Sequence, residues 1–193
     1  MLPIVAFCGM AQAGKDTAAA YFNLTERYVR LSLADELKRD IVKLGLATEE
    51  ECFVTKPPHV RRLLQVYGTD ICRKIHGDDY WLWRWADRAL LDTAGLKAGI
   101  TVGDVRFPNE AEWFLARGAV LIHVRPNERS LALRASWGDT IHVSEEGYRT
   151  IPALYSDHPR FYEIENEGTI QDLFGLLSRM ELLASWPFPP TPR

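Results

Sequence analysis

Glycine and lysine residues near the N-terminus have the types and spacing that bind phosphate groups. A short string begins at Gly9 and ends with Gly14 and Lys15. Glycines permit backbone angles that turn successive amide N–H groups toward one anion, and a lysine ammonium adds a point charge. An apolar run (residues 4–8) precedes the string and an alanine-rich run (residues 18–22) follows it, which is the strand-to-helix setting that a phosphate-binding loop needs. The alternative is a glycine-rich turn without a ligand.

Acidic residues stand where a magnesium ion would be expected. The residue after the lysine of such loops is usually Ser or Thr, but here it is Asp16, and the hydroxyl is displaced to Thr17. Asp16 could hold the metal directly, hold it through a water, or act on a substrate hydroxyl, and the sequence leaves these alternatives open. Asp104 ends a second apolar run (residues 100–103) and is predicted to steer magnesium, the alternative being a cap of the next turn.

The elements that must position these residues alternate along the chain. Strands are predicted at residues 4–8, 28–33, 100–105, 119–124 and 161–165. Helices are predicted at residues 18–22, 35–44, 59–75, 80–91, from 108, at 128–135 and at 170–183, with a loop at 46–58 and an irregular tail at 186–192. This alternation indicates an α/β fold, a three-layer sandwich around a parallel five-stranded sheet. Ligands of such sheets bind beyond the carboxyl ends of the strands, so the loops after Cys8, Leu33, Val102 and Val124 should meet.

Composition narrows the class of protein. The chain has 193 residues, 47% of them hydrophobic and 25% charged, which is typical of one large globular domain. Its net charge of -3 argues against a partner that is a nucleic-acid polymer. Three widely spaced cysteines favour reduced thiols and a cytoplasmic location, and no apolar run has the length that a membrane span needs.

Several further strings resemble one family. The chain is similar to the bacteriophage-type deoxynucleoside monophosphate kinases, within the P-loop kinases, over residues 1 to about 175. The strings that carry the resemblance are residues 14–17 (GKDT), 33–38 (LADELK), 64–70 (LQVYGTD) with Arg73 and Trp81, 104–111 (DVRFPNEA), 142–145 (HVSE) and 166–170 (NEGTI). The loop alone is shared by many kinases, but the set together is specific.

The resemblance implies an activity. It implies transfer of the ATP γ-phosphate to a deoxynucleoside monophosphate with Mg²⁺, on small-molecule substrates and, for a phage-encoded chain, in the host cytoplasm. It also implies a single kinase domain over residues 1–193, with a helical monophosphate-binding region at about 34–95 and a lid at about 126–150. For the oligomeric state, a monomer and a homodimer are both compatible with the sequence.

The resemblance also implies roles for particular residues. The expected ATP contacts are Gly9, Ala11, Ala13, Gly14, Lys15, Asp16, Thr17, Asn166 and Gly168, and the expected metal ligands are Asp16, Thr17 and Asp104. The expected acceptor contacts are Asp35, Lys38, Gln65, Thr69, Arg73, Trp81, Arg106, Glu110, His142 and Glu145. The residues expected to act in transfer are Lys15, Asp16, Arg106 and the lid arginines Arg129 and Arg134.

Each of these roles has a structural alternative. Asp35 with Lys38 fits a helix cap beside a solvated lysine, and Gln65 fits an exposed helix residue. Trp81 belongs to a cluster of tryptophans that more often packs in a core. The residues around Asn166 also fit a turn and a helix cap. At the level of the whole protein, the alternatives are a dephospho-coenzyme A or phosphomevalonate type of kinase, and a nucleotide-binding module without catalysis.

Overall fold

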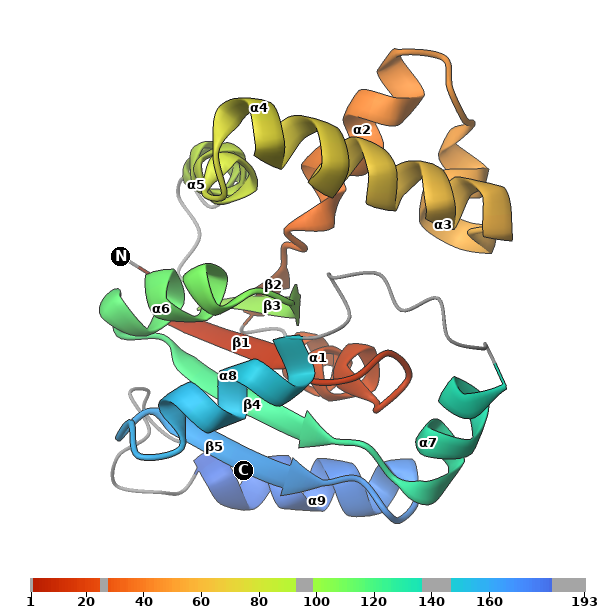
Figure 1. Cartoon of the computed structure of the whole chain (residues 1–193). Helices are drawn as coiled ribbons and strands as arrows, with labels where there is room; N and C mark the ends of the chain where they lie inside the picture. Colours follow the sequence, from red (N-terminus) through yellow and green to blue (C-terminus); the bar gives the residue numbers. More distant parts are fainter. Residues whose placement is uncertain (1, 25–27, 93–98, 137–146, 182–193) are drawn as a thin grey trace. The chain divides into compact units, whose positions relative to one another are not determined.

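Five parallel strands form one sheet in the order β2-β3-β1-β4-β5 (Figure 1). We describe a computed structural model over residues 2–24, 28–92, 99–136 and 147–181. The strands are β1 (Ile4–Cys8), β2 (Tyr28–Arg30), β3 (Gly99–Val105), β4 (Val120–Arg125) and β5 (Phe161–Glu165). Every residue of β1 is buried, because this strand lies at the centre of the sheet and both of its faces are covered.

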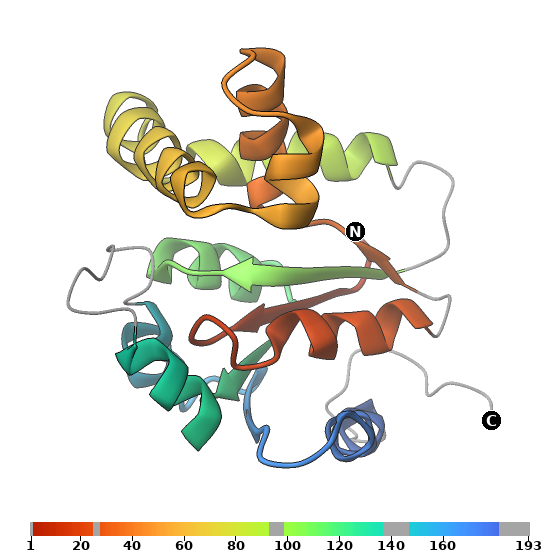
Figure 2. The same ribbon diagram turned by 90° about the vertical axis from the view of Figure 1, so that its right-hand side faces the viewer.

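Helices cover the two faces of the sheet and make three layers. They are α1 (Lys15–Leu24), α6 (Pro108–Ala116), α7 (Glu128–Ala135), α8 (Gly147–Tyr155) and α9 (Ile170–Glu181). The helices α1 and α9 pack together on one face, whereas α6 and α8 pack together on the other (Figure 1, Figure 2). Val5 and Phe7 alternate with their neighbours in β1, so they point into the core with Phe22 of α1 and Leu177 of α9. The predicted α/β fold is confirmed.

The chain divides into two compact units. The first comprises residues 1–30 and 95–193 and holds the sheet, whereas the second comprises residues 31–94. The second unit is helical, with α2 (Ala34–Lys43), the π-helix η1 (Glu51–Thr55), α3 (Pro58–Gln65), the π-helix η2 (Val66–Arg73), α4 (Lys74–His76) and α5 (Tyr80–Asp92). Its core forms around Ile41, Cys52 and Val60. Arg84 joins α5 to α2, since its guanidinium donates to both carboxylate oxygens of Asp40 at 2.8 and 2.9 Å.

Some predicted elements differ from the observed ones. The strand β2 ends at Arg30, three residues earlier than predicted, because the backbone already turns into α2 by Leu33. The π-helix η1 lies in the predicted loop, and the helix predicted at 59–75 includes the π-helix η2. The helix α8 was not predicted, since Pro152 lies inside it. The predicted tail at 186–192 lies outside the described residues.

The three cysteines are free and buried. Cys8 lies in β1, and burial raises the pKa of its thiol to about 12. Burial also raises the thiol pKa values of Cys52 and Cys72. Within the described parts of the chain, every helix is too short or too polar to cross a membrane.

Candidate functional site

The loop after β1 has the backbone of an anion-binding turn. Gly9 and Gly14 have φ values of 137° and 102°, and Gln12 adopts a left-handed φ of 65°. Lys15 is the first residue of α1, and its Nζ donates across the loop to the carbonyl oxygen of Met10 at 2.7 Å. The ammonium therefore lies over a tight turn at the positive end of a helix, where phosphate oxygens bind readily.

Both ends of this loop also have close neighbours. A Cβ at Gly9 would lie 2.4 Å from the carbonyl oxygen of Val124 in β4. A Cβ at Gly14 would lie 2.3 Å from Nδ2 of Asn166, which follows β5. The sequence pattern predicts glycines for their backbone angles, and the structure adds that the backbone of β4 leaves no room for a side chain at Gly9. At Gly14 the close atom belongs to a side chain, so the positive φ is the stronger requirement for glycine.

Asp16 has a cationic partner that the sequence analysis missed. The Nη2 atom of Arg30, at the end of β2, lies 2.5 Å from Oδ1 of Asp16. The two side chains are 40% and 75% exposed, so this ion pair adds little to the stability of the fold. The same carboxylate oxygen lies 3.5 Å from the position that a Cβ at Gly103 would occupy, directly before Asp104. The sequence gives no signal for this pair, because the strand predicted at 28–33 places Arg30 in its middle.

The predicted metal ligands Asp16, Thr17 and Asp104 carry carboxylate and hydroxyl oxygens, which are the ligand type that Mg²⁺ prefers. Their role toward a metal stays a prediction. Among the residues that the structure describes, no group of three or more His, Cys, Asp or Glu side chains is arranged to hold a metal ion.

The loop after β3 carries Arg106, which is exposed, on a backbone that Glu110 fixes. The Glu110 carboxylate is buried and accepts the backbone N–H groups of Arg106 at 2.7 Å and Phe107 at 3.1 Å. Glu110 thereby caps the start of α6, where Pro108 is the first residue. We predicted Glu110 as a substrate contact, and in the structure its carboxylate positions the arginine-bearing loop.

Gly147, the first residue of α8, packs on the same loop. A Cβ built at this glycine would lie 1.6 Å from the carbonyl oxygen of Arg106. Overlap with a backbone atom cannot be relieved by rotating a side chain, so the loop or α8 would have to move. The arrangement explains a glycine that the sequence analysis did not identify.

We therefore expect Gly147→Ala to lower the free energy of unfolding by at least ~1–3 kcal/mol, the range for overpacked sites. Gly175→Ala is the matched control, since Gly175 lies inside α9 and a Cβ there meets nothing within 4 Å. The control should raise stability by ~0.5–1 kcal/mol through higher helix propensity. Denaturant unfolding of both variants tests this. A Gly147→Ala protein as stable as the parent would show that the close packing is absent in solution.

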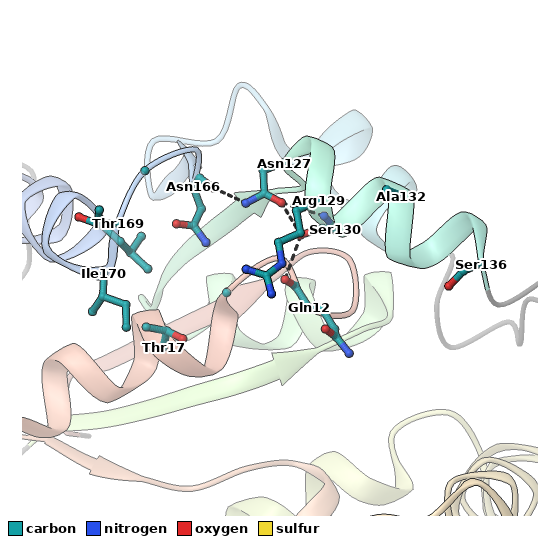
Figure 3. Close-up of a pocket in the computed structure, with 13 residues that line it drawn as sticks. Gln12, Thr17, Asn127, Arg129, Ser130, Ala132, Ser136, Asn166, Thr169 and Ile170 are labelled. Atoms are coloured by element: carbon teal, nitrogen blue, oxygen red, sulfur yellow. Dashed lines mark hydrogen bonds between the residues drawn. The ribbon is translucent and has the colours of Figure 1, made fainter.

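A cavity of about 670 Å³ opens beside the phosphate-binding loop (Figure 3). Its lining comes from that loop, α1, α7 and the segment between β5 and α9, and includes Gln12, Thr17, Arg129, Asn166 and Gly168. Figure 3 shows Arg129 beside Gln12, Asn127 and Ser130. The structure thus brings the predicted lid arginine Arg129 together with the predicted ATP contacts. The side chain of Arg134 lies outside the described part of the chain, as do His142 and Glu145.

In the second unit, Asp35 and Lys38 form an ion pair at the start of α2. Lys38 Nζ lies 3.0 Å from Oδ1 of Asp35 and 4.8 Å from the centre of the Phe53 ring. The other oxygen of Asp35 accepts the backbone N–H of Ser32 at 3.2 Å. Asp35 is therefore not the N-cap, which is Leu33, but its carboxylate, in the first turn of α2, binds the backbone just before the helix. The lysine is largely buried rather than solvated.

The remaining predicted acceptor contacts lie on α3, η2 and α5. Gln65 is the last residue of α3, and Thr69 and Arg73 lie in η2. Arg73 is buried and donates to the carbonyl oxygen of Asp78 at 2.6 Å. Trp81 is buried as well, and its indole N–H donates to the carbonyl oxygen of Gly68 at 2.9 Å. Trp81 thus has the contacts expected of a core residue, the alternative that the sequence analysis raised.

A phosphate-binding loop after the central strand of a parallel sheet defines a P-loop protein of the α/β class. The sequence model of the deoxynucleotide monophosphate kinase family matches residues 46–176. Because this match covers more than half of the chain, the protein belongs to the deoxynucleotide monophosphate kinase family, and it is a phosphotransferase. The resemblance noted in the sequence is confirmed.

Individual proteins are similar over most of the chain. The proposed deoxynucleotide monophosphate kinase of Acanthamoeba polyphaga mimivirus is 27% identical over 172 residues, which are 77% of this chain and 83% of the viral protein. Shikimate kinase from Acinetobacter baumannii, solved with shikimate, is 19% identical with a TM-score of 0.49 over 94% of both chains. Dephospho-CoA kinase from Campylobacter jejuni is 15% identical with a TM-score of 0.45, over 92% of this chain and 94% of that chain.

Proposed function

We propose that the protein transfers the γ-phosphate of ATP to a deoxynucleoside 5′-monophosphate and releases the diphosphate. The observation that carries this proposal is the phosphate-binding loop, which opens beside a cavity of about 670 Å³ in a chain of the deoxynucleotide monophosphate kinase family. Phosphoryl transfer requires positioning and charge neutralisation more than covalent participation of the protein. The loop supplies amide N–H groups and the Lys15 ammonium for these tasks.

The phosphate donor occupies the loop and the cavity in this proposal. The loop amides and Lys15 bind the β- and γ-phosphates, and the cavity beside Arg129 and Gly168 receives the base. Asp16, Thr17 and Asp104 would hold Mg²⁺, which supplies neutralising charge at the phosphates when it is bound. The guanidinium of Arg30 pairs with the Asp16 carboxylate.

The acceptor monophosphate is assigned to arginine side chains. Arg106 is exposed on a loop whose backbone Glu110 holds, and a guanidinium fork matches two phosphate oxygens. The region at about 34–95 is proposed to bind the monophosphate, with Lys38, Gln65, Thr69 and Arg73 as its contacts. The segment at about 126–150, with Arg129 and Arg134, is proposed to be the lid.

Asp104→Asn tests the metal role. Loss of one carboxylate charge is expected to raise the Mg²⁺ concentration for half-maximal activity about tenfold, which corresponds to ~1.4 kcal/mol of binding free energy. The measurement is a magnesium titration of the initial rate at saturating substrates. Asp157→Asn, at an exposed position of the same unit, is the matched control and should leave the titration unchanged. A titration unaltered in Asp104→Asn would remove this residue from the metal site.

A panel of acceptors tests the proposed function itself. The purified protein is incubated with ATP and Mg²⁺ and with each of the four deoxynucleoside monophosphates, their ribose counterparts, dephospho-coenzyme A, phosphomevalonate and shikimate. We expect diphosphate formation with one or more deoxynucleoside monophosphates. Turnover confined to one of the last three acceptors would overturn the proposal, and ATP binding without turnover on any acceptor would indicate a nucleotide-binding module.

A further inference from the structure

We propose that Asn127, Ser130 and Asn166 form a clamp that holds the phosphate-binding loop in its anion-binding shape. These three residues, named here the loop clamp, act as positioning residues and contact backbone atoms of the protein. The proposal rests on the proposed function only in taking the loop as the site of the donor triphosphate. It replaces the predicted role of Asn166 as a direct ATP contact.

The loop contains a conformation that needs support from outside. Gln12 has a left-handed φ of 65°, which is unfavourable by ~1–2 kcal/mol for a residue with a side chain. Such a residue keeps this conformation when surrounding contacts determine it. Within the loop, Ala13 donates its backbone N–H to the carbonyl oxygen of Met10 at 3.2 Å, a long bond that alone gives modest support.

Two side chains bind the consecutive carbonyl groups at this point. The hydroxyl oxygen of Ser130, in α7, lies 3.0 Å from the carbonyl oxygen of Gln12. Nδ2 of Asn166 donates to the carbonyl oxygen of Ala13 at 2.9 Å. Because the carbonyl and N–H groups of a trans peptide unit point in opposite directions, the bond to Ala13 also directs the N–H of Gly14 away from Asn166. The clamp thereby fixes donors that a phosphate group can use.

Asn127 connects Ser130 to Asn166, the two residues of the clamp that bind the loop (Figure 3). Its Oδ1 accepts the backbone N–H of Ser130 at 2.8 Å and lies 2.7 Å from the hydroxyl oxygen of the same residue. Its Nδ2 donates to the carbonyl oxygen of Asn166 at 2.7 Å. The hydroxyl of Ser130 has one proton and can donate it either to Gln12 or to Asn127. The buried position of Ser130 keeps both acceptors within reach.

The clamp joins parts of the chain that line the cavity. Asn127 and Ser130 belong to the start of α7, and Asn166 belongs to the segment between β5 and α9. Since these side chains hold the phosphate-binding loop, the shape of that loop and the shape of the cavity change together. We infer that loss of the clamp weakens the grip on the phosphates even though no group that touches a phosphate has been removed.

Neutral substitutions test the clamp without adding charge beside a polyphosphate. Asn127→Ser keeps a side chain that can cap α7, but it is too short to donate to Asn166. Ser130→Ala removes the hydroxyl, and Asn166→Ala removes the bond to Ala13. Asn23→Ala is the control, because Asn23 accepts a hydrogen bond from Thr101 at 3.0 Å within the same unit. It should affect stability without affecting the loop.

The readouts are equilibrium affinities for ATP and for inorganic tripolyphosphate, together with thermal unfolding. We expect each clamp variant to weaken the binding of both ligands about tenfold, in proportion to the hydrogen bond that is lost. Asn23→Ala should bind both ligands like the parent. A loss confined to ATP would indicate direct contact with the base and would overturn the proposal, as would clamp variants with unchanged affinity for tripolyphosphate.

Binding measurements also separate this proposal from the proposed function. If the parent binds both ligands but phosphorylates none of the acceptors, the proposed function fails while the effect of the clamp remains measurable. A double variant, Asn127→Ser with Asn166→Ala, adds a further criterion. Because both residues belong to one connected set of hydrogen bonds, the affinity loss of the double variant should be smaller than the product of the two single losses. Independent, multiplicative losses would contradict a connected clamp.

Discussion

Replacing Lys15 with alanine is expected to lower kcat by at least about 100-fold, the effect of losing one preorganised group that stabilises charge in the transition state. The ammonium lies over the phosphate-binding loop, 2.7 Å from the carbonyl oxygen of Met10. Its removal leaves the glycine geometry of the loop intact, so the protein should still fold. The measurement is the initial rate with ATP, Mg²⁺ and the best acceptor of the panel, together with thermal unfolding.

Lys43→Ala is the matched control for this experiment. Lys43 is an exposed residue in the last turn of α2, and its loss removes the same charge from the chain. The control should retain the parental rate. Unchanged turnover in Lys15→Ala would exclude the loop from the mechanism.

Arg106→Ala should raise KM for the acceptor monophosphate at least about tenfold while changing KM for ATP much less, since one charge-assisted, bidentate contact is removed. The backbone of this loop is held by the Glu110 carboxylate and by the close packing of Gly147, so the substitution should leave the loop in place. Steady-state rates over a matrix of both substrate concentrations provide the measurement.

Arg117→Ala is the matched control for Arg106→Ala, because Arg117 follows the last residue of the same helix, α6. Its guanidinium lies 3.7 Å from the centre of the Trp113 ring, and its loss should leave both KM values near those of the parent. A defect in Arg106→Ala that affects ATP alone would overturn the assignment of this residue to the acceptor.

The sheet and the phosphate-binding loop could be predicted because their signals are local. An apolar run of five residues reads as a buried strand, and the spacing of Gly9, Gly14 and Lys15 is contained in a few consecutive positions. The helix α8 has no such signal. It begins with a glycine and contains Pro152, so packing against α6 stabilises it despite poor local propensity.

The positions of Gln65 and Thr69 show a second limit. In an α-helix over residues 59–75, as predicted, these two residues are four apart and would share a face. From Val66 the chain forms a π-helix, whose wider turns are closed by bonds to the fifth residue. The angle between the two side chains therefore differs from the predicted one. The apolar pattern of residues 59–75 contains no signal that distinguishes the two kinds of helix.

The loop clamp and the partner of Asp16 could not be predicted for another reason. Ser130 and Asn166 contact loop residues that lie more than 100 positions earlier in the chain, and no periodicity relates such distant segments. Asn127 had a weak local signal, since an asparagine before a helical run indicates an N-cap. That signal predicts the cap of α7 but not the second bond, to Asn166.

Burial of the cysteines has a consequence for the chemistry of the protein in air. Because burial raises the pKa of the Cys8 thiol far above its usual range, the thiol stays protonated at pH 7, and only the thiolate reacts readily with oxidants and electrophiles. The sulfur atoms of Cys52 and Cys72 are shielded in the same way. The three thiols of the folded protein should therefore react slowly with peroxide and with alkylating reagents.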